Sequence, residues 1–400
     1  MLKNYSVESI IGIHGYSTPQ VPGIGGKIKE RWEDFIVREI PPSGHPIING
    51  TEIGEDFGGM YIHCVLWKKG IDTFNAIKKL SKSWKKPEKD FGFAGLKDAD
   101  AETFQRISIW NLDETNVGTP NLTNINTFHP IRQKFAIRIG DLLGNFFEIV
   151  IRNIQREWKE EDWNHFRIHL ESKGILNFYG SQRFGSKRPI LHVIGKLLLQ
   201  EKYSEAIDKY IGETSPLEHE SIVNLRKEFF ETRSYGKLRL KFPKKYQIER
   251  KLLIGLERHR AAKDIIFSLP KPFLRLAISA YQAYLFNQVL SYINEINTNL
   301  QSETAIPLLG YQSVHQGVSE ITWNKLLDLL EADAINLDSF NHSQPSLRSK
   351  GSLRRALVFP SKLDYSSIVN EEKGIRVCFS LPKGSYGTIL LREIIKVDNT

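Results

Sequence analysis

The sequence predicts an α/β protein of the α+β kind, with a mostly antiparallel sheet built from both chain ends and an inserted α/β domain. Three observations predict this fold. Short β-branched and aromatic runs fill the first 155 residues, longer helical periods follow, and strand-like alternation returns after Pro360. We therefore expect a sheet domain over residues 1–176 and 358–400 and an inserted domain over 177–357.

The first elements follow from local patterns. Residues 35–40 (FIVREI) and 61–67 (YIHCVLW) predict strands, and the second is apolar on both faces, as in a central strand. Asp72 is placed to cap a helix whose apolar side chains recur every three or four residues, Phe74, Ile77, Leu80 and Trp84. The outer face of this helix is basic, with Lys78, Lys79, Lys82, Lys85 and Lys86. Such a face is either solvated surface or a contact for an RNA backbone.

Later elements alternate or follow helical spacing. Alternation over 135–139 and again over 147–151, on either side of GDLLGN, predicts a hairpin. A helix around Phe166 is expected to end at Gly174. A long helix spans 274–292, and the alternating run IRVCFS places Ile375, Val377 and Phe379 on one strand face.

Charge and cysteine usage limit the class of protein. The chain carries 55 Lys and Arg against 46 Asp and Glu, a net charge of +9, which favours a polyanionic partner. Only two cysteines occur, Cys64 and Cys378, and no HExxH motif is present, so we expect no metal site. The start of the chain lacks a signal-peptide pattern and no run approaches the about 20 apolar residues of a membrane span. We expect a reduced, cytoplasmic protein.

Two segments carry candidate chemistry. In AGLKDADAETFQ, residues 94–105, a lysine and Asp98 follow a glycine-rich turn, although such a pair is often only a surface ion pair. In NFYGSQRFG, residues 177–185, aromatic side chains alternate with an arginine. That composition suits RNA stacking and phosphate contact, and it equally suits a packed domain junction.

These segments resemble those of one enzyme family. GLKDADAETFQ resembles the catalytic motif of TruD-type pseudouridine synthases, with matching Gly95, Lys97, Asp98, Ala101, Thr103 and Gln105. NFYGSQRFG is similar to a second signature, and WEDFIVREI, LLGNFFEIVIR, SAYQAYLFNQVL and LRRALVFP resemble further segments in the same order. LPKGSYGTILLREII looks like the closing strand, and RFGSKRPILHVIGK looks closest to the archaeal and eukaryotic branch. The resemblance covers nearly the whole chain.

The resemblance implies an isomerase that converts a uridine of tRNA to pseudouridine. The family's usual target is position 13, and position 35 of a tyrosine tRNA is a further candidate. The resemblance implies that the protein uses no cofactor and no metal. It also implies a cytoplasmic monomer that binds tRNA, and binding of other RNAs is left open. Asp98 would act at the sugar as nucleophile or base, and we expect Lys97 to stabilise its anionic form.

The resemblance also assigns substrate contacts. Phe147 would stack on the flipped uracil, with Asn145 beside it, although a core position on a strand explains Phe147 equally. Phe35 and Lys97 would complete the pocket, and the cleft between the domains would be organised by Gln182, Arg183 and Phe184. One departure concerns the two residues after Asp98, Ala99 and Asp100, where many members carry a basic residue. The alternative function is a non-catalytic RNA-binding or RNA-chaperone protein that keeps the same basic cleft.

Overall fold

The structure is a computed structural model that describes residues 7–48, 54–117, 121–296, 299–368 and 374–396. Its contacts divide the chain into two compact units. The helical unit comprises Met1–Ser17 and Leu176–Leu357, and the sheet unit comprises Thr18–Ile175 and Val358–Thr400. Residues 7–17 thus group with the middle of the chain, whereas the sequence analysis placed them with the sheet. The physical reason is a set of hydrogen bonds to the longest helix, such as Asn287 Nδ2 to the Ile11 carbonyl at 2.9 Å.

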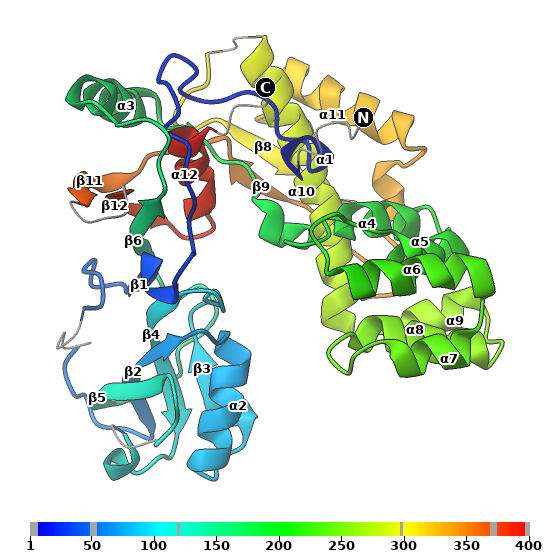
Figure 1. The fold of residues 1–400 in the computed structure, drawn as a ribbon, viewed down its shortest axis with the longest axis horizontal. Helices are drawn as coiled ribbons and strands as arrows, with labels where there is room; N and C mark the ends of the chain where they lie inside the picture. Colours follow the sequence, from blue (N-terminus) through cyan, green and yellow to red (C-terminus); the bar gives the residue numbers. More distant parts are fainter. Residues whose placement is uncertain (1–6, 49–53, 118–120, 297–298, 369–373, 397–400) are drawn as a thin grey trace. The chain divides into compact units, whose positions relative to one another are not determined.

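The sheet unit contains strands from both ends of the chain (Figure 1). Its strands are β1 (Phe35–Ile40), β2 (Tyr61–Lys69), β3 (Phe91–Phe93), β4 (Glu102–Trp110), β5 (Ile125–Gln133), β6 (Gly144–Arg152), β11 (Ser361–Ile368) and β12 (Gly374–Pro382). Their order is β11-β12-β6-β1-β4-β2-β5, with β3 on β4. β1 and β4 run parallel, and the other described neighbours run antiparallel. The predicted fold class is confirmed, because β12, which follows the inserted segment in the sequence, pairs with β6, which precedes it.

Helices of the sheet unit cover and connect these strands. They are η1 (Trp32–Asp34), α2 (Thr73–Ser83), η2 (Glu88–Asp90), η3 (Glu114–Asn116), α3 (Glu160–Lys173) and α12 (Gly387–Ile395). Asp72 caps α2 by accepting from Asn75 N at 2.9 Å, as its sequence predicts. Ile77 and Leu80 of α2 pack on β2 in one core cluster, whereas Phe74 is 59% exposed.

Two sequence expectations in this unit are wrong. Residues 134–143 do not form a hairpin with β6, which pairs with β1 and β12 instead. Phe135 and Ile139 are 76% and 73% exposed, so their alternation does not mark a buried strand face. The final segment is the helix α12 and not a closing strand, because Ile389, Leu390 and Ile394 are buried at helical spacing.

The helical unit is built around one long helix, α10 (Lys271–Glu295). The other elements are α1 (Val7–Ile10), η4 (Ser181–Arg183), α4 (Leu191–Leu199), α5 (Tyr203–Gly212), α6 (Glu220–Thr232), α7 (Tyr235–Lys241), α8 (Gln247–Glu257), α9 (Ala262–Phe267), β8 (Ala305–Leu308), α11 (Glu320–Ala332), η5 (Leu337–Phe340) and β9 (Ser352–Arg355). β8 and β9 pair antiparallel. The chain passes between the units through β7 (Ile175–Leu176) and β10 (Leu357–Val358). Within the described ranges, no helix combines the length and the apolar character that crossing a membrane requires.

Candidate active site

Asp98 lies in the loop between β3 and β4 and is paired with a lysine from a distant segment. Lys29 Nζ donates to Asp98 Oδ2 at 2.9 Å, and the two side chains are 22% and 28% exposed. Lys29 has a φ of 61°, a conformation that a lysine seldom adopts. Twelve other described residues that are not glycine also have a positive φ, so the ion pair and not the backbone conformation singles out this position. The pair therefore marks Asp98 as the centre of the candidate site.

A second lysine, Lys68, binds the backbone of the loop that carries Asp98. Lys68 of β2 is fully buried, and its Nζ donates to the carbonyls of Ile71 at 2.7 Å, Lys97 at 3.3 Å and Asp98 at 2.8 Å. Burial lowers the pKa of Lys68 to about 8, and the charge of Asp98 opposes this shift. The Lys68 ammonium thus fixes the backbone of the residue that carries the carboxylate, Asp98.

Polar side chains of the motif brace the same loop. Lys97 N donates to Thr73 Oγ1 at 3.0 Å, and Thr73 Oγ1 donates to Gln105 Oε1 at 2.9 Å. Gln105 Nε2 in turn donates to the Gly95 carbonyl at 3.2 Å. Thr73 and Gln105 are fully buried, where polar groups need partners. The motif therefore ties its own loop to the start of α2.

The Lys97 ammonium contacts Asn145 and Glu39. Its Nζ donates to Asn145 Oδ1 at 2.6 Å and lies 3.8 Å from Glu39 Oε2. Glu39 is fully buried and also accepts from Arg106 Nε at 3.0 Å. Burial lowers the pKa of Lys97, and the Glu39 carboxylate opposes this shift. Lys29 donates a hydrogen bond to Asp98, and the charge of Asp98 also opposes the lowering of the Lys97 pKa, so stabilisation of the Asp98 anion by Lys97 stays a prediction.

An aromatic cluster lies next to this polar network. Phe35 contacts Phe147 edge to face at 6.3 Å between ring centroids, and Phe147 stacks on Phe379 at 5.1 Å. Lys29 Nζ lies 4.1 Å from the centroid of the Phe35 ring, so this lysine joins the cluster to Asp98. Phe35 is 2% and Phe147 6% exposed, so both rings belong to the core in this structure. Stacking of Phe147 on a base remains a prediction.

The NFYGSQRFG segment belongs to the helical unit, whereas Asp98 belongs to the sheet unit. Phe184 is fully buried and contacts His192 at 5.5 Å. Arg183 Nη1 donates to Ser279 Oγ at 3.4 Å, and its guanidinium lies 5.3 Å from the ring centroid of Tyr179. Gln182 is exposed. These contacts show local packing within the helical unit, and a role in RNA binding stays a prediction.

Sequence reasoning missed four residues of the site: Lys29, Glu39, Lys68 and Arg106. A usable signal existed for Glu39 and Lys68, because each is a charged residue within an otherwise apolar strand pattern. Lys29 carried no such signal, since its segment VPGIGGKIK reads as a flexible turn. Over the described part of the chain, no group of three His, Cys, Asp or Glu side chains is placed to hold a metal ion.

Known proteins share this fold. A crystal structure of a protein described as the "Putative tRNA pseudouridine synthase D (TruD)" from Methanosarcina mazei superposes with a TM-score of 0.76 and 28% identity over 98% of both chains. The fold and the site thus define the class as the pseudouridine synthases.

Sequence relatives give the family. A "Probable tRNA pseudouridine synthase D" from Archaeoglobus fulgidus is 32% identical over 98% of this chain and 100% of its own length. A relative of the same name from Thermococcus gammatolerans is 32% identical over 94% of this chain and 96% of its own length. The family model for tRNA pseudouridine synthase D (TruD) matches residues 10–305 and 292–394. The chain belongs to the tRNA pseudouridine synthase D (TruD) family.

Replacing Lys29 tests the ion pair at Asp98. We expect Lys29→Met to lower the single-turnover rate roughly 10- to 100-fold, because the carboxylate loses the ammonium that orients it. Lys29→Arg should restore part of the rate. Lys27→Met is the matched control, since the Lys27 side chain is 72% exposed and only two residues away. Equal rates for Lys29→Met and the control would contradict this role.

Proposed function

We propose that this protein isomerises a uridine of tRNA to pseudouridine and that Asp98 acts on the sugar of that uridine. The observation that carries the proposal is the set of contacts that hold Asp98 in place. Its carboxylate is paired with Lys29, its backbone is held by buried Lys68, and it remains 28% exposed. A carboxylate that is rigidly held yet accessible is what attack on a substrate requires.

The chemistry needs no added reactant. The bond from N1 of uracil to the sugar breaks, the base turns, and C5 of uracil forms the new bond to the sugar. The proton on C5 leaves to solvent and N1 gains a proton, so the product is an isomer of the substrate. Asp98 serves as nucleophile or base at the sugar in this sequence, and Lys29 keeps its carboxylate oriented.

The Lys97 and Asn145 pair is suited to hold the detached base. An ammonium has only donors, so Lys97 fixes Oδ1 of Asn145 as the acceptor in their 2.6 Å bond. The amide N–H groups of Asn145 are thereby oriented to donate to a carbonyl, and uracil presents two carbonyls. Phe35 and Phe147 would supply the apolar wall beside it. The base must leave its stack to reach this position.

Position 13 of tRNA is our first candidate for the target and position 35 of a tyrosine tRNA the second. The decisive experiment maps pseudouridine in total tRNA from cells with and without this protein. It is paired with tritium release from [5-³H]uracil-labelled transcripts treated with purified protein. Loss of one pseudouridine in the deletion strain, together with tritium release in vitro, supports the enzyme. A cellular effect that persists with Asp98→Ala, without tritium release by the wild type, would favour the RNA-chaperone alternative.

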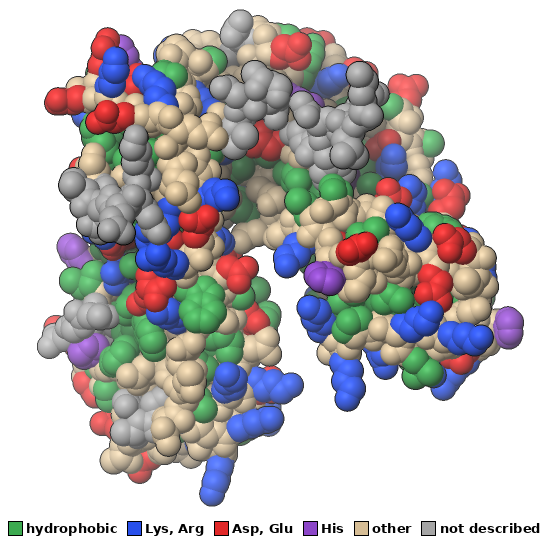
Figure 2. Space-filling view, viewed as in Figure 1, with side chains coloured by type: hydrophobic (Ala, Val, Ile, Leu, Met, Phe, Trp, Pro, Cys, Tyr) green, Lys and Arg blue, Asp and Glu red, His purple; other side chains and the backbone are tan. Residues whose placement is uncertain are grey.

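The lysine face of α2 is a candidate track for the RNA backbone. Lys78, Lys79 and Lys82 are exposed, and Figure 2 shows Lys and Arg side chains gathered over the region of α2. The helix begins at Thr73, which bonds to the backbone of Lys97, so this face starts beside the catalytic loop. Phosphate contacts by such lysines make RNA affinity depend on salt.

Changing three lysines of α2 to glutamine should weaken binding of tRNA. We expect a triple Lys78, Lys79 and Lys82 variant to raise the Kd for tRNA roughly 10-fold or more. It should also flatten the dependence of log Kd on log salt by about one unit for each lost phosphate contact. The matched control changes three exposed lysines elsewhere on the sheet unit, Lys159, Lys173 and Lys362. Identical salt slopes for the two triple variants would show that α2 is only solvated surface.

A further inference from the structure

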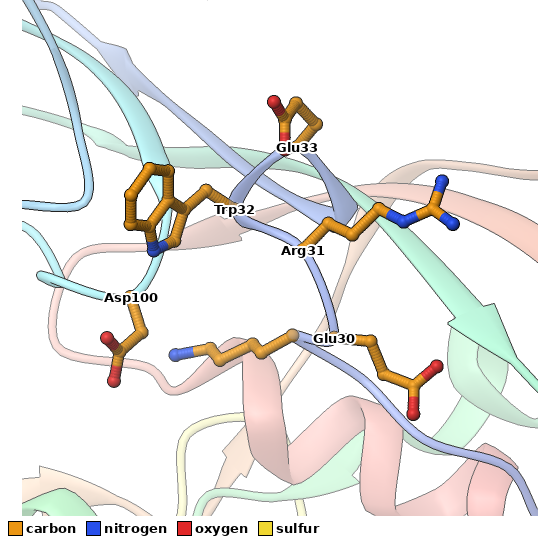
Figure 3. Close-up of a pocket in the computed structure, with 6 residues that line it drawn as sticks. Glu30, Arg31, Trp32, Glu33 and Asp100 are labelled. Carbon is orange, nitrogen blue, oxygen red and sulfur yellow. The ribbon is translucent and has the colours of Figure 1, made fainter. Parts of the chain in front are cut away.

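A small pocket opens directly beside the Asp98 and Lys29 pair (Figure 3). It has a volume of about 350 Å³ and is lined by Lys29, Glu30, Arg31, Trp32, Glu33 and Asp100. Its position is set by Lys29, which bonds to Asp98 at 2.9 Å, and by Asp100, which follows Asp98 by two residues. A substrate group that enters this pocket is therefore adjacent to the reacting sugar.

Trp32 in this pocket is exposed and yet firmly held. Trp32 as a residue is 44% exposed, and a Cβ at Gly70 would lie 2.7 Å from its ring, so the ring rests on the Gly70 backbone. Lys69 Nζ lies 5.9 Å from the ring centroid. The short helix that carries Trp32 is anchored by buried Asp34, which accepts from Arg152 Nε at 2.8 Å and Nη2 at 2.7 Å. A fixed aromatic face open to solvent is a platform for a nucleic-acid base.

The charge of the pocket favours a base over a phosphate. Asp100 is exposed, and in Figure 3 its carboxylate and the Trp32 indole lie on the same side of the pocket, whereas Arg31 points the other way. A carboxylate repels phosphate and accepts hydrogen bonds from amino groups of bases. Adenine, guanine and cytosine carry such an amino group, and uracil does not. The exposed Asp100 carboxylate thus has a ligand of matching chemistry.

We propose that this pocket binds the nucleotide next to the target uridine, with its base stacked on Trp32 and its amino group donating to Asp100. The inference rests on the proposed function, and it extends that function to recognition of the neighbouring base. When the target uridine leaves its stack, its neighbour loses a stacking partner. Trp32 replaces that partner and lowers the cost of extruding the uridine next to Asp98.

Variants of Trp32 test the stacking. We expect Trp32→Ala to raise the KM for tRNA about 5- to 100-fold, the range of base stacking on an aromatic side chain, with a smaller effect on kcat. Trp32→Phe should recover most of the loss, because a ring is retained. Trp110→Ala is the matched control, since Trp110 is 41% exposed in the same unit and stands outside the pocket lining. An unchanged KM for Trp32→Ala, with active wild type, overturns the subsite.

Substrates altered beside the target test the hydrogen bond to Asp100. Transcripts that differ only in the nucleotide on either side of the target uridine should react several-fold faster with an amino-bearing base than with uracil at one of those two positions. Asp100→Ala should remove this preference, because alanine offers no acceptor to the amino group. A wild type that shows no preference at either position overturns the role of Asp100. Wild type that releases no tritium from any transcript means failure of the proposed function itself, a result distinct from both others.

Discussion

Asp98→Asn should abolish pseudouridine formation, with a fall in the single-turnover rate of at least about 10⁴-fold. The amide keeps the shape of the carboxylate but is neither a nucleophile nor a base, so the step at the sugar stops. The measurement is tritium release from labelled tRNA with enzyme in excess. Binding should change far less, because Asp98 contributes no positive charge for phosphate contact.

Two controls accompany this variant. Asp364→Asn removes an exposed carboxylate of the same unit that accepts from Tyr365 N at 2.9 Å, and it should leave the rate unchanged. Thermal unfolding should show that Asp98→Asn remains folded. Substantial tritium release by a folded Asp98→Asn protein would remove Asp98 from its proposed role and leave the site without a reacting group.

Lys68→Met should lower kcat about 100-fold without contact between Lys68 and substrate. Lys68 acts as a positioning residue, because its ammonium holds the carbonyls of Ile71, Lys97 and Asp98. Misplacement of a reacting group by about 1 Å can cost roughly 10² in rate. The matched control is Lys396→Met, since Lys396 Nζ also donates to carbonyls of the sheet unit, those of Thr18 and Val21. The two variants should differ in kcat and resemble each other in KM.

The pH profile separates positioning from simple loss of stability. The pKa of Lys68 is about 8 in the folded protein, so we expect kcat of the wild type to fall above about pH 8 as the ammonium loses its proton. The free energy of unfolding should change in the opposite direction as the pH rises. Between pH 8 and the ordinary lysine value of 10.5, the unfolded chain binds the proton that the folded chain has released. Unfolding free energy from this group therefore rises with pH. Lys68→Met should lack both effects, and a wild-type profile identical to that of Lys68→Met would contradict the assignment.

The sequence was most informative where a local pattern determines the structure. FIVREI became β1, the capping Asp72 began α2, and the helical spacing over 274–292 lies within α10. These elements depend on neighbours three or four residues away, or on alternate residues, which a pattern displays. The alternation around Phe135 and Ile139 predicted a strand that does not form, because these apolar side chains are exposed and do not face the core.

The candidate site was only partly predictable because its contacts join distant segments. The motif identified Asp98 and Lys97, but it did not show that the ammonium bonded to Asp98 comes from Lys29, 69 residues earlier. Lys68 was visible as a charged residue in an apolar strand pattern, but its role depends on a bond to the backbone of Asp98, 30 residues later. Pairings of this kind follow from the order of strands in the sheet, which one sequence does not reveal.

The interleaving of both chain ends has a consequence for synthesis of the protein on the ribosome. β12 fills the place between β6 and β11, and Phe379 of β12 stacks on Phe147. The ribosome makes residues 374–382 only after the whole of the helical unit. Because nascent domains generally fold as they emerge, the helical unit can fold while the sheet around Asp98 still lacks two strands. A nascent chain that has not yet reached β11 and β12 therefore carries Asp98 on an incomplete sheet.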